Sequence, residues 1–424
     1  MKPVPSHGSA LGATTVDDHV ALRRQLLRLQ RRGRWKAIGL IAPLMVFLAL
    51  VFVVPIVLLL ARAVDNHEVP AVLPQTSIAM KDWNGDAPPT HVLADALIVD
   101  LRTSPREAVA EVAKRLNYYQ SGLRSMVLKT AREVNNESAS NLSGLERLKE
   151  IDERWLEPAT WSVIQRALPP TTDFYLLASL DLRRDAQGAI VAATGDSAIY
   201  RDVIVRTFVI SAAVTLLCLL LGYPLAYWIA IAAPRTARLL LLMVLLPFWT
   251  SLLVRTTAWV VVLQSGGVVN SLLGWLGLID PAHPLELIHN RIGVLIAMTH
   301  ILLPFMALPI YSVMKSIPPN YMRAAASLGA SPLRAFLRVY LPLSLPGISA
   351  GCLLVFILAL GYYITPALVG GPRDQMLSYF IAYFASQVTN WGMAAALSAT
   401  LLVLVLLLYA VYHRMVGIDK LRMG

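Results

Sequence analysis

Six long apolar runs constrain the fold of this chain more than any other feature. A helix needs about 20 predominantly apolar residues to cross the hydrocarbon core of a bilayer. The runs of that length are Ala37–Ala61, Thr207–Ala232, Leu239–Leu263, Ile292–Met314, Leu343–Val369 and Met393–Tyr412. With 56% hydrophobic and 15% charged residues, the chain is too apolar for an ordinary soluble domain. The sequence therefore predicts an all-α polytopic membrane protein with six transmembrane helices.

The first run, residues 37–61, has a second interpretation as a cleavable signal peptide. Ala61-Arg62-Ala63 resembles a cleavage site. The apolar part of a signal peptide has only about 7–15 residues, however, whereas this run has 25. We therefore expect a retained transmembrane anchor.

Charges beside the apolar runs predict the orientation, because Lys and Arg are enriched in cytoplasmic loops. Residues 1–36 carry eight Lys/Arg and two acids, and the loop 315–342 carries four Lys/Arg and no acid. The segments expected on the cytoplasmic side of the membrane are 1–36, 233–238, 315–342 and the tail 417–424, so both termini are predicted to be cytoplasmic. This clustering beside spans accounts for the net charge of +11, and we expect no nucleic-acid partner.

Residues 62–200 form a large insertion that follows the first run and is predicted to lie outside. They hold 15 Lys/Arg and 19 Asp/Glu, unlike the basic remainder of the chain. Apolar residues recur at helical spacing in Arg106–Val134 and in Gly144–Pro158, and the residues around Asp185–Gly188 are typical of a hairpin. We expect an α or α+β domain. It shows no catalytic constellation, so a packed spacer without chemistry is the simpler interpretation.

Neither the cysteines nor the histidines suggest a metal site. Cys218 and Cys352 lie inside apolar runs, where a free thiol packs as a small apolar side chain. The eight histidines have no ligand spacing, and the chain has no G-x-x-x-x-G-K-[ST] phosphate loop. We predict no metal and no cofactor.

The loop 315–342 is longer than the roughly 2–8 residues that commonly link neighbouring helices. Pro318-Pro319-Asn320 predicts a helix stop and a new start with Asn320 as N-cap, and Gly329 predicts the end of that helix. Ser331-Pro332 predicts a second helix, which Pro342 is expected to break before the next run. This arrangement suits docking of another protein. A basic interfacial helix on lipid headgroups is the alternative.

The same loop resembles the signature loop of the integral-membrane subunits of bacterial ABC importers. That family's pattern is Glu-Ala-Ala, three residues, Gly, nine residues, Ile-x-Leu-Pro. The residues at these positions here are Arg323, Ala324, Ala325, Gly329, Val339, Leu341 and Pro342. The stretches that extend the resemblance to spermidine/putrescine-type permeases are Leu246–Gln264, Leu302–Ala325, Gly370–Pro372 and Asn390–Leu402. Residues 201–416 are therefore expected to form a permease core.

The resemblance implies a mechanism and a set of partners. It implies that the loop 323–342 couples to separate ATPase subunits, whose closure on ATP switches the pathway from inward-open to outward-open. It also implies a second permease subunit, a periplasmic substrate-binding protein, and a place among the lipids of the bacterial inner membrane with 62–200 in the periplasm. Arg323 replaces the family's acidic residue, so no role is transferred to that position.

Polar residues in or near the runs are the candidate lining of a translocation pathway, since charges inside spans are costly and usually functional. Arg255 lies nearer the outer end of the third run, and His300 lies in the middle of the fourth. The candidates are Trp249, Arg255, His300, Tyr362, Tyr363, Thr365, Asn390 and Trp391. The structural alternatives are interface anchoring for the arginine and aromatics, and a helix–helix hydrogen bond for His300.

The sequence leaves alternatives open for the transported solute and for the class of protein. A polyamine would bind carboxylates or aromatic faces. From Val203 onward the acids are Asp280, Glu286, Asp374 and Asp419, none deep in a run, so other small organic solutes such as opines and aminophosphonates stay open. The other classes are a membrane-anchored periplasmic ligand sensor, for which the inner segments are short, and a secondary transporter, which needs buried acidic relays.

Overall fold

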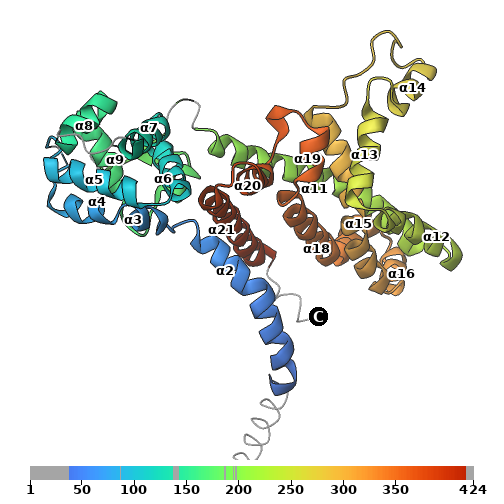
Figure 1. Cartoon of the computed structure of the whole chain (residues 1–424). Helices are drawn as coiled ribbons and strands as arrows, with labels where there is room; N and C mark the ends of the chain where they lie inside the picture. The colour runs from blue at the N-terminus through green and yellow to red at the C-terminus, as the bar shows by residue number, and fades with distance from the viewer. Residues whose placement is uncertain are drawn as a thin grey trace, which may run out of the picture. The chain divides into compact units, whose positions relative to one another are not determined.

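The computed structural model describes residues 38–85, 87–136, 143–185, 188–193, 195 and 198–416 (Figure 1). The chain divides into two compact units, Met1–Leu59 and Leu60–Gly424. The first candidate span is a helix over Ile38–Ala61, which is π-helical over Ala49–Val53 (η1) and ends as α2 (Val54–Ala61). The predicted basic segment 1–36 and the tail 417–424 lie outside the described residues.

The segment that follows α2 is a helical body with its own apolar core. Its helices are α3 (Glu68–Val72), α4 (Pro74–Ala79), η2 (Met80–Asp82), α5 (His91–Thr103), α6 (Arg106–Tyr119), α7 (Leu123–Asn136), α8 (Gly144–Ile151), η3 (Glu153–Leu156) and α9 (Pro158–Ala167). The apolar stripe predicted on α6 is buried at Val109, Val112, Ala113 and Leu116. Trp155 and Trp161 pack at the centre, with ring centroids 5.4 Å apart. Helices α3 to α9 gather into this body in Figure 1.

A short region joins the helical body to the helices that contain the other candidate spans. It contains α10 (Phe174–Ala178) and the antiparallel strands β1 (Leu182–Arg184) and β2 (Ile190–Ala192), which form the predicted hairpin. Asp181, just before β1, accepts hydrogen bonds from the backbone N–H groups of Tyr200 (2.9 Å) and Arg201 (2.7 Å). The Asp181 carboxylate thereby satisfies donors at the start of the next helix, where the helix dipole also favours negative charge.

The remaining helices contain five further candidate spans. They are α11 (Tyr200–Ile231), α12 (Pro234–Leu245), η5 (Leu246–Trp249), α13 (Leu252–Leu263), α14 (Val268–Trp275), α15 (Arg291–Ser316), α16 (Asn320–Ser327), α17 (Pro332–Ala335), η6 (Phe336–Tyr340), α18 (Leu341–Leu360), α19 (Ile364–Val369), η7 (Pro372–Asp374), α20 (Leu377–Ser386) and α21 (Trp391–Val416). With Ile38–Ala61, the described residues hold six helices long and apolar enough to cross a membrane, as predicted. Helices α11, α15 and α18 pack together around Met298, Leu302, Met306 and Val355.

The third span differs from the predicted Leu239–Leu263. The apolar run is broken into α12, η5 and α13, and the candidate span is Leu252–Trp275. Pro247 lies in the tight turn η5, and Ser251 caps α13 by accepting a hydrogen bond from the Val254 N–H (3.2 Å). Arg255 therefore lies in the first turn of the candidate span Leu252–Trp275, whereas in the predicted run Leu239–Leu263 it lay in the second half.

The fifth span also differs from the predicted Leu343–Val369. The helix runs from Pro332 to Leu360, and the polar residues after it belong to a break and to the separate helix α19. Two segments predicted to be loops also contain helices, because residues 234–238 belong to α12 and the segment 370–392 contains α20. The sixth span, α21, covers the predicted Met393–Tyr412.

Candidate functional site

The segment between α15 and α18 is the first candidate site. Helix α16 ends at Ser327, and Gly329 follows with a φ of +82°. The Ala330 N–H donates to the Ala325 carbonyl (3.0 Å) and the Gly329 N–H to the Ala326 carbonyl (2.9 Å). This pair of bonds is a Schellman motif, which ends helices and favours glycine at the left-handed position. The predicted helix, glycine turn and helix are therefore present.

Three details of this segment differ from the predictions. The N-cap of α16 is Pro319, so Asn320 is already helical. Ser331 is the N-cap of α17, but its hydroxyl makes no capping hydrogen bond. Pro342 does not break the helix, since η6 and α18 continue through it. The π-helical turn η6 lies just before Pro342, and its wider hydrogen-bond pattern accommodates a residue that has no N–H to donate.

Aromatic rings fix this segment to the core. Phe336 and Tyr340 stack on each other, and both meet the ring of Tyr227 on α11 edge-on, at 5.6 and 5.3 Å between centroids. Tyr223, one turn before Tyr227, also packs on Phe336, and its hydroxyl lies 3.2 Å from that of Ser344. Each ring pair of this kind stabilises by about 0.5–1.5 kcal/mol beyond its burial. The segment is therefore rigidly seated on α11 and α18.

The other side of the segment is exposed. Leu328 is 88% exposed and Leu333 is 67% exposed, on either side of the glycine turn. Of the residues of the family pattern, Arg323, Ala324, Gly329 and Pro342 are exposed, and Ala325, Val339 and Leu341 are half-buried. In the described part of the chain no acid is paired with Arg323. Apolar side chains around small residues form a surface that another protein can cover closely.

The second candidate site is a polar cluster between α13, α15 and the break before α19. Trp259 Nε1 donates to His300 Nδ1 over 3.1 Å, so a proton on the neutral ring lies on Nε2. The Arg255 charge lies within electrostatic range of both His300 and Tyr362. Within the described chain, its Nε and Nη1 are buried without a hydrogen-bond partner. A charged side chain inside a membrane span costs free energy, and charged residues kept there are usually functional.

Of two further candidates, Thr365 contacts α13, which also carries Arg255, and Tyr363 contacts α20. The Thr365 hydroxyl is fully buried and lies 3.1 Å from that of Thr256 on α13. This contact ties α19 to α13. Tyr363, which is 41% exposed, packs on the ring of Tyr379, with 6.2 Å between ring centroids.

Three predicted pathway residues do not join the cluster. Trp249 ends η5 and is 84% exposed. Asn390 accepts a hydrogen bond from the Met393 N–H (3.1 Å) and is the cap of α21, and Trp391 begins that helix. Asn390 and Trp391 instead line a cavity with residues of the 62–200 segment.

Sequence reasoning missed the partners that complete both sites. Trp259 lies on α13 four residues after Arg255, a spacing that could have marked one polar face, whereas Thr256 is adjacent to Arg255 and gives no such signal. Tyr223 and Tyr227 are likewise four residues apart on α11. The described residues contain no group of three or more His, Cys, Asp or Glu side chains that could hold a metal ion.

Comparisons with known proteins match the second half of the chain. The family model of the binding-protein-dependent transport system inner membrane component matches residues 188–416. The spermidine/putrescine transport system permease protein PotB of Escherichia coli (strain K12) is 36% identical over 216 residues, 51% of this chain and 78% of that protein. The inner membrane ABC transporter permease protein YdcU of the same strain is 33% identical over 234 residues, 52% of this chain and 73% of that protein.

A solved structure also aligns with about half of the chain. It is a bacterial alginate ABC transporter in complex with an alginate pentasaccharide-bound periplasmic protein, with a TM-score of 0.43 and 20% identity over 51% of this chain and 77% of that chain. The family match contains both candidate sites and excludes the helical body formed by α3 to α9.

Proposed function

We propose, from the premise that this chain belongs to the binding-protein-dependent transport system inner membrane component family, that it imports polyamines or a related small organic solute. As a member it is an ABC importer permease subunit of the inner membrane, a transport subunit rather than an enzyme. The family implies ATPase and substrate-binding protein partners. Membership in this family decides against the two other classes of protein, a membrane-anchored periplasmic ligand sensor and a secondary transporter.

The proposed route of coupling is the exposed segment around Gly329. The observation that carries it is a turn held by a Schellman motif and followed by Phe336 and Tyr340, whose rings meet Tyr227 of α11 edge-on, with Leu328 and Leu333 exposed. A rigid element transmits the movement of a docked ATPase to the spans beneath it, whereas a loose loop would absorb it. ATP is bound by that partner. A second permease subunit completes the pathway.

The proposed orientation places 62–200 in the periplasm and both termini in the cytoplasm. Lys and Arg beside the spans support it. With this orientation the Gly329 turn faces the cytoplasm, where an ATPase subunit is found.

Support for a polyamine comes from the relatives of that name and from two aromatic rings, that of Trp259, which bonds His300, and that of Tyr362, which lies within electrostatic range of Arg255. The unpaired Nε and Nη1 of Arg255 favour a second candidate. A buried arginine repels a polycation and attracts a carboxylate, so a carboxylate-bearing solute is the alternative within the same function.

Co-purification with a cognate ATPase subunit tests the coupling. Gly329→Arg should lose the ATPase, because a long charged side chain would project from the docking surface. Gly277→Arg is the matched control: Gly277 has a φ of +69°, and like Gly329 it has no atom within 4 Å of an added Cβ. Equal recovery by both variants would remove this turn from the docking surface. A wild-type chain that binds no ATPase would overturn the coupling proposal.

Uptake by cells that express the whole importer tests the solute. Labelled spermidine should enter, and excess putrescine should compete with it. Arg255→Gln should leave this uptake unchanged or increase it, since a repelling charge has gone. Failure of spermidine to enter, with a loss of carboxylate uptake in Arg255→Gln, would favour the second candidate.

A further inference from the structure

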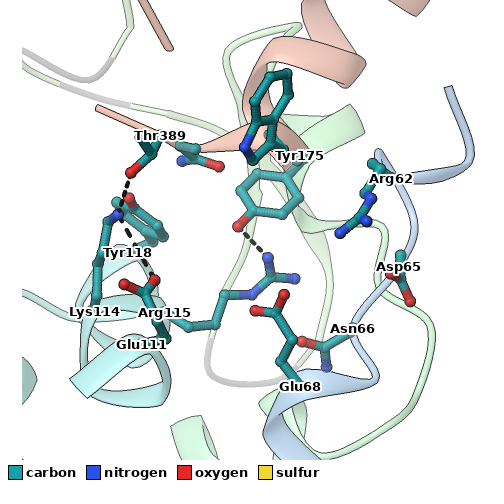
Figure 2. Close-up of a pocket in the computed structure, with 13 residues that line it drawn as sticks. Arg62, Asp65, Asn66, Glu68, Glu111, Lys114, Arg115, Tyr118, Tyr175 and Thr389 are labelled. Carbon is teal, nitrogen blue, oxygen red and sulfur yellow. Dashed lines mark hydrogen bonds and ion pairs between the residues drawn. The ribbon is translucent and has the colours of Figure 1, made fainter. Parts of the chain in front are cut away.

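A cavity of about 320 Å³ lies where the helical body meets the start of α21 (Figure 2). One wall comes from α3 and α6, and the opposite wall comes from α10 and the residues Thr389–Gly392. Gly392 lets the Tyr175 ring lie directly against the backbone, because a side chain there would collide with that ring. Ligand pockets usually have volumes of about 300–1,000 Å³, so this one suits a small molecule.

Arg115 on α6 provides the most specific feature of the cavity. Its Nη1 donates to the Tyr175 hydroxyl, and its guanidinium carbon lies 4.2 Å from the centroid of that ring. Its Nε and Nη2 are buried and have no hydrogen-bond partner among the described residues. These two nitrogens form one complete edge of the guanidinium, and two parallel N–H groups on such an edge match the two oxygens of a carboxylate. Leaving buried donors unpaired is costly, which a ligand would relieve.

The charges that surround Arg115 are balanced. The basic lining residues are Arg62, Lys114 and Arg115, and the acidic ones are Asp65, Glu68 and Glu111. Most of these groups are already engaged within the chain. Asp65 bonds His67 Nδ1 (2.5 Å), and Lys114 Nζ lies 3.8 Å from Glu111 and donates to the Val388 carbonyl (3.0 Å).

Glu68 on α3 is the acidic lining residue that makes no contact of this kind in the described chain. In the part of the chain that the structure describes it forms no ion pair, and its side chain projects into the same cavity as Arg115 (Figure 2). The cavity thus offers the unpaired edge of Arg115 and the carboxylate of Glu68, and the exposed Arg62 also lines it. Tyr118 and Trp391 provide apolar surface beside them.

We propose that this cavity binds a small zwitterion of the α-amino-acid type, with its carboxylate on Nε and Nη2 of Arg115 and its ammonium group facing Glu68. A simple anion would leave Glu68 beside it as a repelling charge. A polyamine would meet the guanidinium of Arg115. A molecule with both charges satisfies both groups, and its size fits the cavity.

This site goes beyond the proposed import function, and its lining contains neither Arg255 nor His300 of the polar cluster. Its lining from Arg62 to Tyr175 lies outside the family match, and only Thr389–Gly392 lie inside it. A bound ligand would connect the helical body to the first turn of the last span. The ligand is therefore placed to stabilise the contact between these two parts of the chain.

The test uses the full-length chain in detergent micelles and the shift of its thermal unfolding midpoint. The probes are the twenty L-α-amino acids one at a time, with acetate and methylamine as single-charge controls. At least one amino acid should raise the midpoint with increasing concentration, because a ligand that binds only the folded state stabilises it. Acetate and methylamine should produce no shift at the same concentrations.

Two variants separate binding from folding. Arg115→Lys keeps the charge but removes the two-nitrogen edge, and Glu68→Gln alters an exposed side chain. Each variant should raise the half-saturating amino-acid concentration about tenfold or more. Arg124→Lys, an exposed arginine of α7 outside the cavity, should bind as the wild type does. If Arg115→Lys does not fold, Glu68→Gln carries the test. The absence of any amino-acid shift, an equal shift with acetate, or unchanged binding by Glu68→Gln would overturn the proposal.

Discussion

At Gly329 the backbone conformation and the surrounding space can be separated. The φ of +82° lies in the left-handed region, which costs a residue with a Cβ about 1 kcal/mol or more. An added Cβ would meet no atom within 4 Å, so the cost is conformational and includes no clash. Asparagine tolerates this region better than alanine does. The two substitutions therefore differ in backbone strain much more than in the space they need.

We expect Gly329→Ala to reduce the solute-stimulated ATPase activity of the reconstituted importer more than Gly329→Asn does. About 1 kcal/mol corresponds to roughly a fivefold change in the population of the ordered turn. The measurement is ATP hydrolysis in proteoliposomes with and without loaded binding protein. Equal activities for the two variants would show that the turn is held by its partner and not by its own conformation.

At Asp152 an ion pair links stability to pH. Arg154 binds this carboxylate through two nitrogens, at 2.9 and 2.7 Å, and this bond lowers the pKa of Asp152 below its ordinary value of 3.8. Stability from such a group is present above the ordinary pKa and is lost as the pH falls through the folded value.

Asp152→Asn should therefore lower the unfolding midpoint of the full chain at pH 7, and this difference from the wild type should shrink below about pH 4. Because the pair is partly exposed, the loss should be about 1 kcal/mol or less. Thermal unfolding at a series of pH values measures it, with the exposed neighbour variant Glu153→Gln as control. A difference that stays constant with pH would mean that the ion pair is not its source.

At the scale of elements, close approach of α15 and α18 depends on glycine. A Cβ at Gly351 would lie 2.9 Å from Met306 Sδ and 3.0 Å from the Met306 carbonyl oxygen, and one at Gly347 would lie 3.0 Å from Ile310 Cα. Small residues at such crossings let helix backbones pack closely in a membrane.

Gly351→Val should lower the unfolding midpoint, because overpacking of a tight contact costs about 1–3 kcal/mol. Gly361→Val is the control. Its Cβ would meet only the Leu358 carbonyl oxygen, at 3.8 Å, and its φ is negative. Thermal unfolding in detergent gives the comparison. Equal destabilisation by both variants would mean that the crossing tolerates a larger separation.

The breaks in the third and fifth spans show which part of the fold the sequence could predict. Apolar length predicts that there are six candidate spans, because each must match the thickness of a bilayer. It cannot locate the breaks, since Leu246–Trp249 is apolar throughout and still forms a tight turn. Likewise Gly329 was predictable from local conformation, whereas the contact of His300 with Trp259 depends on how two helices pack.

At the scale of the whole molecule, the two ends of the helical body meet. Asp65 and Thr171 form an antiparallel bridge, in which the Asn66 N–H donates to the Pro170 carbonyl (3.0 Å) and the Thr172 N–H to the Val64 carbonyl (2.9 Å). The apolar core of the body consists of residues between these ends, from Val69 to Leu168. Residues 66–170 can therefore be removed together with their entire core, leaving the cap of α11 by Asp181 in place.

We expect a chain in which a short Gly-Ser linker replaces residues 66–170 to insert into the membrane and to recover its ATPase subunit. The family match and all six candidate spans lie outside the excised part. The same chain should lose the amino-acid-dependent shift of its unfolding midpoint, because Glu68 and Arg115 are gone. Deletion of α7 alone is the control, and it should reduce the folded yield because it cuts the core open. An excised chain that reaches the membrane but binds no ATPase would mean that the helical body supports the permease structure itself.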